Sequence, residues 1–135
     1  MSFGSAKPRN KAEQARFDAI KAAGICIACK LRGVDSYAVE IHHLLSGGRR
    51  IGHMATIGLC CWHHRGVPFE FCSHAECRDA FGPALSEGSK PFRAEFGTDA
   101  ELLQVQNELL SERERGIATA DAFMGIFGLW RVAGG

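Results

Sequence analysis

The spacing of apolar residues predicts a helix near the start of the chain. Within residues 11–23, Phe17 and Ile20 lie one helical turn apart. Asn10 stands where an N-cap is expected, and Gly24 stands where helices commonly end. The pattern therefore predicts a helix over residues 11–23 that turns one apolar face toward a core.

Three further helices are predicted in the second half of the chain. A short one is expected over residues 89–97, with a proline in its first turn. The capping box Thr98–Glu101 opens a longer helix that runs to about Arg115, and its leucine and valine residues recur at helical spacing. Thr119 is the expected N-cap of a last helix over residues 120–130.

Between these helices, apolar and polar residues alternate with the period of a strand. Residues 37–45 are rich in β-formers, and a glycine-rich turn over 46–50 separates them from a second predicted strand within 51–58. Residues 59–65 predict the start of a short helix, and the segment 68–89 is expected to be irregular. The order strand, loop, strand, helix predicts an α+β fold, a small finger surrounded by α-helices and long irregular loops.

The length and composition of the chain favour one compact domain. The chain has 135 residues, of which 46% are hydrophobic. We assign residues 1–9 to a flexible basic arm, residues 10–117 to the domain, and residues 118–135 to an apolar helical extension. No apolar run of about eighteen residues occurs, so no membrane span is predicted. No apolar stretch follows the basic residues at the start, so we expect no secretory signal and a cytoplasmic protein.

Charge is unevenly distributed, although the formal net charge is only +1. Residues 1–50 hold nine Lys or Arg and four Asp or Glu, whereas residues 51–135 hold seven and eleven. The basic half favours an anionic substrate, or it is an ordinary solvated surface. The weak net charge argues against tight, autonomous and nonspecific binding to duplex nucleic acid.

Histidines are the chain's most distinctive chemical feature. Five of the six fall inside 23 residues, and four of those five form two adjacent pairs, His42-His43 and His63-His64, with His53 between them. Histidine supplies a neutral metal ligand and also a base that titrates near neutral pH. The clustering therefore predicts a metal site with its own proton acceptor.

Cysteine spacing predicts a second, structural metal site. Cys26 and Cys29 form a CxxC knuckle, and Cys60 and His63 offer a second ligand pair on a later turn. Together they predict a tetrahedral structural zinc site, with Cys61 as a spare thiol. Three alternatives are disulfides in a secreted protein, buried free cysteines, and a redox pair at the CxxC knuckle.

Cys72, His74 and Cys77 lack an evident fourth partner for a further zinc site. We interpret them as loop residues.

The order of these motifs resembles a known class of nucleases. It is similar to the HNH, or ββα-metal, nuclease finger with an added zinc knuckle. The similar features are a strand that ends in His-His, a Gly-Gly loop, a second strand and then Leu-Cys-x-x-His-His. The chain also resembles the phage Ref, or recombination enhancement, nucleases. Three segments carry this resemblance: residues 40–66, Phe-Gly-Pro-Ala-Leu at 81–85, and Phe-Gly-Thr-x-x-Glu-Leu-Leu at 96–103. That resemblance implies DNA cleavage in the cytoplasm of a bacterial host, directed by a RecA-type recombinase filament.

The resemblance also implies a role for each histidine of the finger. His42 and His64 would bind a catalytic divalent metal, expected to be Mg²⁺, Mn²⁺ or Zn²⁺. Imidazole ligands tolerate Zn²⁺, Mn²⁺ or Ni²⁺ better than an all-oxygen site would, so the working metal stays open. His43 would be the general base, because a neutral imidazole can accept a proton near pH 7. The expected products are 5′-phosphate and 3′-hydroxyl ends.

Two positions depart from the HNH pattern. The central Asn that orients the base in many HNH enzymes is absent here, and Thr56 and His53 are the nearest candidates. A frequent last metal ligand is replaced by Pro68. His53 is therefore either a third ligand or a base-orienting group.

Three arginines are candidates for binding DNA. Arg49 and Arg50 follow the Gly-Gly turn, which allows close backbone approach, and Arg65 follows the second histidine pair. Each is either a phosphate ligand or an exposed side chain. The main hypothesis is a metal-dependent DNA endonuclease, and the alternative is a noncatalytic zinc module that binds DNA or a protein.

Overall fold

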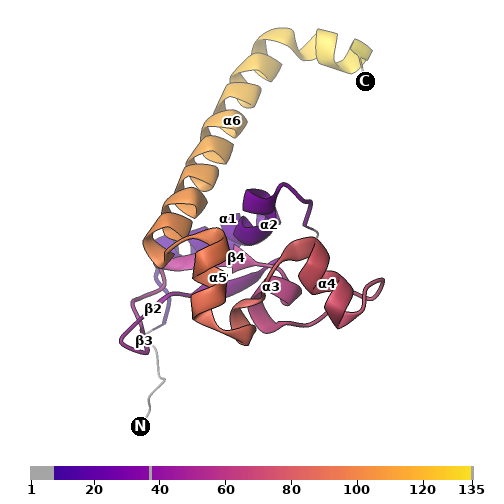
Figure 1. Ribbon diagram of the computed structural model, residues 1–135. Helices are drawn as coiled ribbons and strands as arrows, with labels where there is room; N and C mark the ends of the chain where they lie inside the picture. The colour runs from indigo at the N-terminus through magenta and orange to yellow at the C-terminus, as the bar shows by residue number, and fades with distance from the viewer. Residues whose placement is uncertain (1–7, 37, 135) are drawn as a thin grey trace.

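A long helix stands away from a smaller body that holds the remaining elements (Figure 1). The computed structural model describes residues 8–36 and 38–134, with side chains up to residue 116. Its helices are α1 (Lys11–Ala23), α2 (Ile27–Arg32), α3 (Cys61–Arg65), α4 (His74–Phe81), α5 (Ser89–Phe96) and α6 (Asp99–Gly134), with a 3₁₀ turn η1 (Leu85–Glu87). Its strands are β1 (Glu40–His43), β2 (Leu45–Ser46), β3 (Arg49–Arg50) and β4 (Thr56–Leu59).

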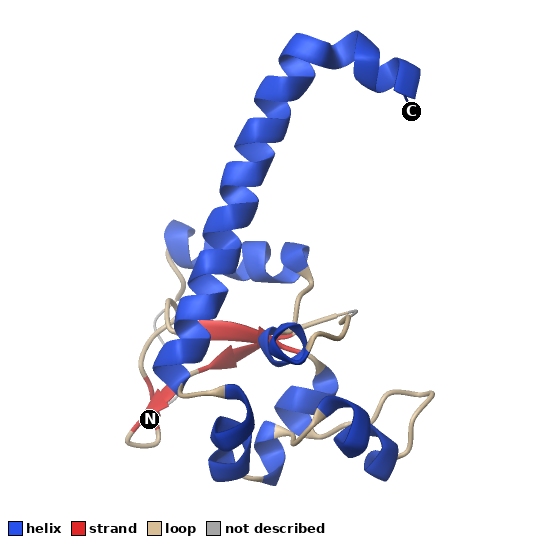
Figure 2. Cartoon of the chain, turned by 45° about the horizontal axis from the view of Figure 1, so that its top comes forward, coloured by secondary structure: helices blue, strands red, loops and turns tan. Residues whose placement is uncertain are grey.

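Two short antiparallel strand pairs lie at the centre of the body. β1 pairs with β4 in the register Glu40↔Leu59 to His43↔Thr56, and α3 follows β4 directly. The connection between β1 and β4 holds the second pair, in which Leu45 of β2 faces Arg50 of β3. Figure 2 shows helices arranged around the β1–β4 pair. The strand, loop, strand, helix order predicted from the sequence is confirmed, and the α+β class with it.

The strand boundaries differ from the prediction. Residues 37–45 were expected as one strand, but β1 covers only residues 40–43, and Tyr37 lies outside the described residues. The second strand begins at Thr56 rather than near residue 51. The reason is the β2–β3 hairpin, which uses the chain on both sides of the Gly-Gly turn for its own short ladder.

Helix α1 has the predicted bounds and caps. Asn10 accepts a hydrogen bond from the backbone N–H of Glu13, and the Glu13 carboxylate accepts one from the backbone N–H of Asn10. Gly24 ends the helix with φ of 62°. Phe17 and Ile20 are buried, as their spacing predicts.

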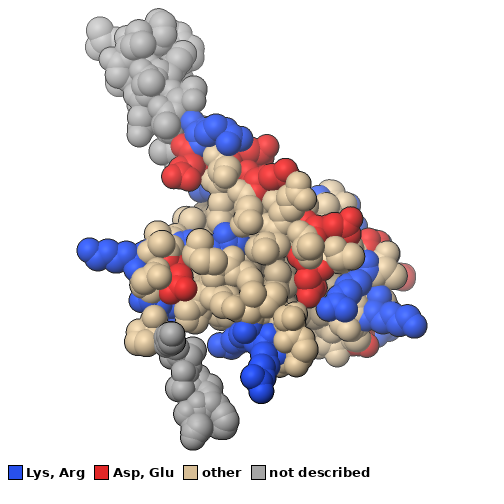
Figure 3. Space-filling model, turned by 90° about the vertical axis from the view of Figure 1, so that its left-hand side faces the viewer, with Lys and Arg blue, Asp and Glu red and all other residues tan. Residues whose placement is uncertain are grey.

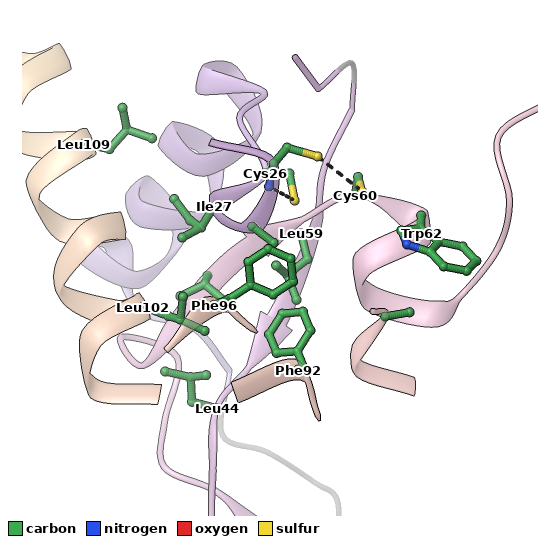
Figure 4. Close-up of a cluster of buried hydrophobic side chains, with 14 of the residues drawn as sticks. Cys26, Ile27, Leu44, Leu59, Cys60, Trp62, Phe92, Phe96, Leu102 and Leu109 are labelled. Carbon is green, nitrogen blue, oxygen red and sulfur yellow. Dashed lines mark hydrogen bonds between the residues drawn. The ribbon is translucent and has the colours of Figure 1, made fainter. Parts of the chain in front are cut away.

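The core lies between the strands and the helices around them. Figure 4 shows Phe92 and Phe96 of α5 beside Leu59 of β4, with Leu102 and Leu109 contributed by α6. Trp62 of α3 is fully buried, and its indole N–H donates to the carbonyl of Gly82 at 2.9 Å. This hydrogen bond ties α3 to the residue that follows α4.

The segment 68–89 was predicted to be irregular, and this prediction is wrong. It contains α4, opened by a capping box between Ser73 and Glu76, and the turn η1. His74 and Cys77, interpreted as loop residues, therefore lie on a helix. The Ser-x-x-Glu spacing is a standard N-terminal signal that the sequence interpretation missed.

The break predicted at Thr119 is also wrong. The backbone stays helical from Asp99 to Gly134, so one helix replaces the two expected. A threonine caps a helix only where the backbone turns extended, and no proline interrupts this stretch. The division at residue 118 remains a prediction, and most of the arm 1–9 lies outside the described residues. No helix in the described part of the chain is long and apolar enough to cross a membrane.

Candidate metal centre and histidine cluster

Four buried side chains form one compact group of metal-ligand atoms. They are the predicted set: Cys26, Cys29, Cys60 and His63. Their ligand atoms all lie within 4.8 Å of one another. Within the described residues, no second group of three or more such side chains is present. Figure 4 places Cys26 and Cys60 at one end of the hydrophobic core.

Local helix geometry brings the four ligands together. Cys26 is the N-cap of α2 and accepts the backbone N–H of Cys29, while Cys60 is the N-cap of α3 and accepts the backbone N–H of His63. In each knuckle the cap residue and the third helical residue turn toward the same point. The helix N–H groups also offset the negative charge of the sulfur atoms.

The geometry of this group fits zinc. His63 Nδ1 lies 3.3 to 3.4 Å from the three Sγ atoms, and the Sγ atoms of Cys29 and Cys60 are 3.9 Å apart. Around a tetrahedral Zn²⁺, bond lengths of about 2.3 Å to sulfur and about 2.1 Å to nitrogen give separations of about 3.6 and 3.8 Å. These measured separations are therefore close to those of a tetrahedral zinc site.

The outer contacts of His63 support the same interpretation. Its Nε2 lies 2.6 Å from the carbonyl oxygen of Phe81, so the proton sits on Nε2 and the lone pair of Nδ1 faces the sulfur atoms. Burial raises the pKa of Cys26, but hydrogen bonds from Cys29 and Cys60 outweigh it and lower that pKa to about 3. Hydrogen bonds with Cys26 and Cys60 raise the pKa of Cys29. A cation bound among the three sulfur atoms would favour the thiolate form of each cysteine.

A second cluster forms where β1 meets α3. The rings of His42 and His64 lie edge to face with their centroids 5.1 Å apart. His64 Nδ1 lies 2.8 Å from the carboxylate of Glu40, so Nδ1 donates and Nε2 stays available. Burial, and then the neighbouring His64, lower the pKa of His42 to about 4. His42 is therefore neutral near pH 7, the state that binds metal.

Glu40 is a contact that the sequence interpretation did not single out. Besides His64, it accepts two hydrogen bonds from Arg65 Nε and a third from Arg65 Nη2 at 2.5 Å. The hydrogen bond to Arg65 comes first among the causes that lower the Glu40 pKa to about 2. The available signal was strand alternation, because Glu40 shares a face of β1 with His42.

His43 faces the opposite side of β1, as the alternation predicts. Its Nε2 lies 3.1 Å from Nδ1 of His53. The Phe17 ring packs edge to face against both imidazoles, with ring centroids 5.7 Å apart in each pair. Burial first, and then the charge of Arg50, lower the pKa of His43. The structure thus places the two adjacent histidines in two different pairs, His42 with His64 and His43 with His53.

Thr56 is fully buried and lies beneath the loop that carries His53. Its hydroxyl donates to the carbonyl of His53 at 2.9 Å and accepts from Arg16 Nε at 2.9 Å. Arg16 also donates to the Thr56 carbonyl at 2.6 Å and to Asn107 of α6 at 2.7 Å. Arg16 therefore ties α1, β4 and α6 together behind the histidine pair.

The remaining candidates separate into exposed and structural residues. Arg49 and Arg50 are exposed on β3. Cys61 is partly buried, and its Sγ contacts the carbonyl of Val67 at 3.4 Å rather than the metal group. Cys77 is buried in the core.

Comparison with known proteins identifies the family. Residues 10–111 match the profile of a family described as recombination enhancement, RecA-dependent nuclease. The chain belongs to this family. The RecA-dependent nuclease match covers both the zinc group and the histidine pairs, and the family description indicates a nucleic-acid substrate and dependence on RecA. A search of curated proteins gave no match.

Proposed function

We propose that this RecA-dependent nuclease is a metal-dependent DNA endonuclease of the HNH class, directed to recombination intermediates by a RecA filament. The observation that carries the proposal is the meeting of His42 and His64, with His43 on the other face of the same strand. The β1–β4–α3 order and the structural metal group on α3 agree with an HNH finger that a zinc site stabilises.

His42 and His64 would hold the catalytic ion. Two imidazoles on one tetrahedral ion have ring centres about 5 Å apart for bonds of about 2.1 Å, and the observed 5.1 Å fits. The neutral imidazole of His42 and the Nε2 atom of His64 would supply the lone pairs that bind the ion. When bound, the ion supplies Lewis-acid stabilisation of charge on the phosphate and the leaving oxygen.

His43 is the proposed general base. If His43 donates from Nε2 to His53, its Nδ1 carries the lone pair that accepts a proton from water. The lowered pKa keeps this nitrogen unprotonated at cellular pH.

Of the two candidates left open for orienting the base, the geometry favours His53. It contacts His43 directly, whereas the Thr56 hydroxyl donates its only proton to the carbonyl of His53 and accepts a hydrogen bond from Arg16. Thr56 is therefore a support for the His53 loop. On the strength of its contact with His43, we propose His53 as an orienting group rather than a third metal ligand.

The arginines divide into two roles. Arg49 and Arg50 are free to meet phosphates, because both are exposed and no ion pair to either is found in the described part of the chain. Arg65 already binds Glu40, so its first role is to hold the carboxylate that orients His64.

Cleavage of a displacement loop tests the proposal. The native chain, with a RecA filament and Mg²⁺ or Mn²⁺, should cut the DNA, and His43→Ala should cut about 100-fold to 10,000-fold more slowly while still folding. His74→Ala is the matched control, because His74 is exposed on α4 outside the cluster. Binding without any metal-dependent cutting would instead favour the noncatalytic zinc module.

A further inference from the structure

The connection between His43 and His53 forms a small projecting hairpin. It comprises β2, β3 and the residues that follow them, and we call residues 45–54 the prong. Figure 1 shows β2 and β3 at the lower left edge of the body, below the first turn of α6. Because His43 and His53 contact each other, the prong leaves the body directly beside the proposed base.

We propose that the prong contacts DNA at unpaired bases, with an arginine on each face directed to a phosphate backbone and its apolar side chains packed on the bases. This inference rests on the proposed function, because it assumes that DNA occupies the neighbouring site.

The prong is firmly held at its base and open at its tip. Leu44 is buried, its N–H donates to the carbonyl of Ala55, and its carbonyl accepts the N–H of Ile51. At the tip, Gly47 and Gly48 have φ of 59° and 80°, as a two-residue hairpin turn requires. A methyl group at either glycine would meet nothing within 4 Å. The turn therefore serves the hairpin's shape and packs on no other part of the described chain.

Large apolar side chains on the prong are unusually exposed. Leu45 is 47% exposed, Ile51 58% and Met54 52%. They are three of the six exposed large apolar residues among those described, yet they fall within ten consecutive residues. A local concentration of this kind marks a surface that another molecule covers.

Charge identifies nucleic acid as the partner that fits. No Asp or Glu occurs from residue 41 to residue 69, which includes the whole prong. Adjacent strand residues point to opposite faces, so Arg49 and Arg50 place one positive charge on each side of the hairpin. Figure 3 shows Lys and Arg side chains at the lower edge of the face on which β2 and β3 lie.

The combination of charge and apolar surface favours unpaired DNA. In paired DNA the base faces are stacked and inaccessible, whereas apolar side chains insert where bases are unstacked. A hairpin with a cation on each face fits between two separated strands. Its position beside His43 and His53 means that DNA held for cutting must pass it.

Fluorescence of 2-aminopurine tests the contact directly. The probe is placed in a four-base bubble of a duplex, and binding is measured without added Mg²⁺ or Mn²⁺, in the presence and absence of RecA. The test variant is Leu45→Ser/Ile51→Ser/Met54→Ser. The matched control is Leu31→Ser/Val67→Ser/Phe71→Ser, which alters the other three exposed large apolar residues among those described, all outside the prong. Zinc content and melting temperature verify that both fold.

We expect the native chain and the control to change the fluorescence, and the prong variant to bind the bubble about tenfold more weakly. Arg49→Ala/Arg50→Ala should weaken binding to bubble and paired DNA alike and reduce the salt slope by about 2. If the native chain gives no fluorescence change, or if the prong variant matches it, the proposal is wrong. Native DNA binding by the prong variant with loss of RecA-stimulated cutting would assign the surface to the recombinase instead. A fluorescence change that depends on the prong, without cutting by the native chain, would support the prong and refute the nuclease proposal.

Discussion

Arg16→Met removes the guanidinium that joins α1 to β4 and α6. Arg16 is only 9% exposed and donates three hydrogen bonds, two to Thr56 and one to Asn107. Methionine keeps a similar apolar stem but no donor. The Thr56 carbonyl and the Asn107 side chain then lose a charged partner, and the hydroxyl that supports the His53 loop loses its neighbour.

The expected loss of stability in Arg16→Met is the difference between two larger free energies, that of the lost hydrogen bonds and that of burying the guanidinium. Hydrogen bonds from a charged donor contribute about 1.5–3 kcal/mol each. Burial of the guanidinium opposes this, and the same burial lowers the pKa of Arg16. Since methionine escapes that desolvation cost of several kcal/mol, we expect the free energy of unfolding to fall by about 3 kcal/mol.

Urea unfolding of the zinc-loaded protein, followed by circular dichroism, measures this change. Arg113→Met is the control, because Arg113 is an exposed arginine of α6. Its expected effect is below about 0.5 kcal/mol. In a double-mutant cycle with Thr56→Val, Arg16→Met should show a coupling of about 1 kcal/mol or more. A change under about 1 kcal/mol for Arg16→Met, or independent effects of the two substitutions, would refute the described role.

Three further predictions concern stability. Gly58→Ala should lower the free energy of unfolding by about 1–3 kcal/mol in urea, because the new Cβ would lie 2.9 Å from Ile20 Cγ2. The control Gly116→Ala meets nothing within 4 Å and should stabilise α6 by up to about 1 kcal/mol. Equal effects of the two substitutions would contradict this account. Removal of zinc by a strong chelator should abolish cooperative unfolding, since zinc binding of about 10–16 kcal/mol rivals the whole stability of a domain; a cooperative melt of zinc-free protein would disprove it. Hydrogen bonds with Thr98 lower the Glu101 pKa below 4.5, so the carboxylate stabilises α6 above that pH and its contribution disappears as pH falls through the lowered pKa. The melting temperature of native protein should therefore fall more steeply between about pH 5 and 3 than that of Glu101→Gln, and parallel curves would exclude this role.

Local signals in the sequence were sufficient for much of the fold. Asn10 and Gly24 predicted both ends of α1, because capping depends on neighbours in the chain. The CxxC spacing likewise predicted which cysteines gather, since a knuckle is built within one turn. The same kind of signal, Ser73 with Glu76, was present for α4 and was overlooked.

Contacts between distant residues had no comparable signal. Arg16 and Asn107 are 91 positions apart, and nothing in their local sequence indicates that they meet. Strand alternation predicted that His42 and His43 face opposite ways, but the partner of each was fixed only when β4 and α3 were placed. The pairing of His42 with His64 was expected from family resemblance alone.

Anomalous X-ray scattering from crystals grown with Mn²⁺ tests the central claim most directly. We predict one peak at the zinc edge among Cys26, Cys29, Cys60 and His63, and a separate manganese peak between the rings of His42 and His64. The second peak should disappear in His42→Ala and persist in His43→Ala. A fully occupied zinc site with no manganese between His42 and His64 would contradict the account.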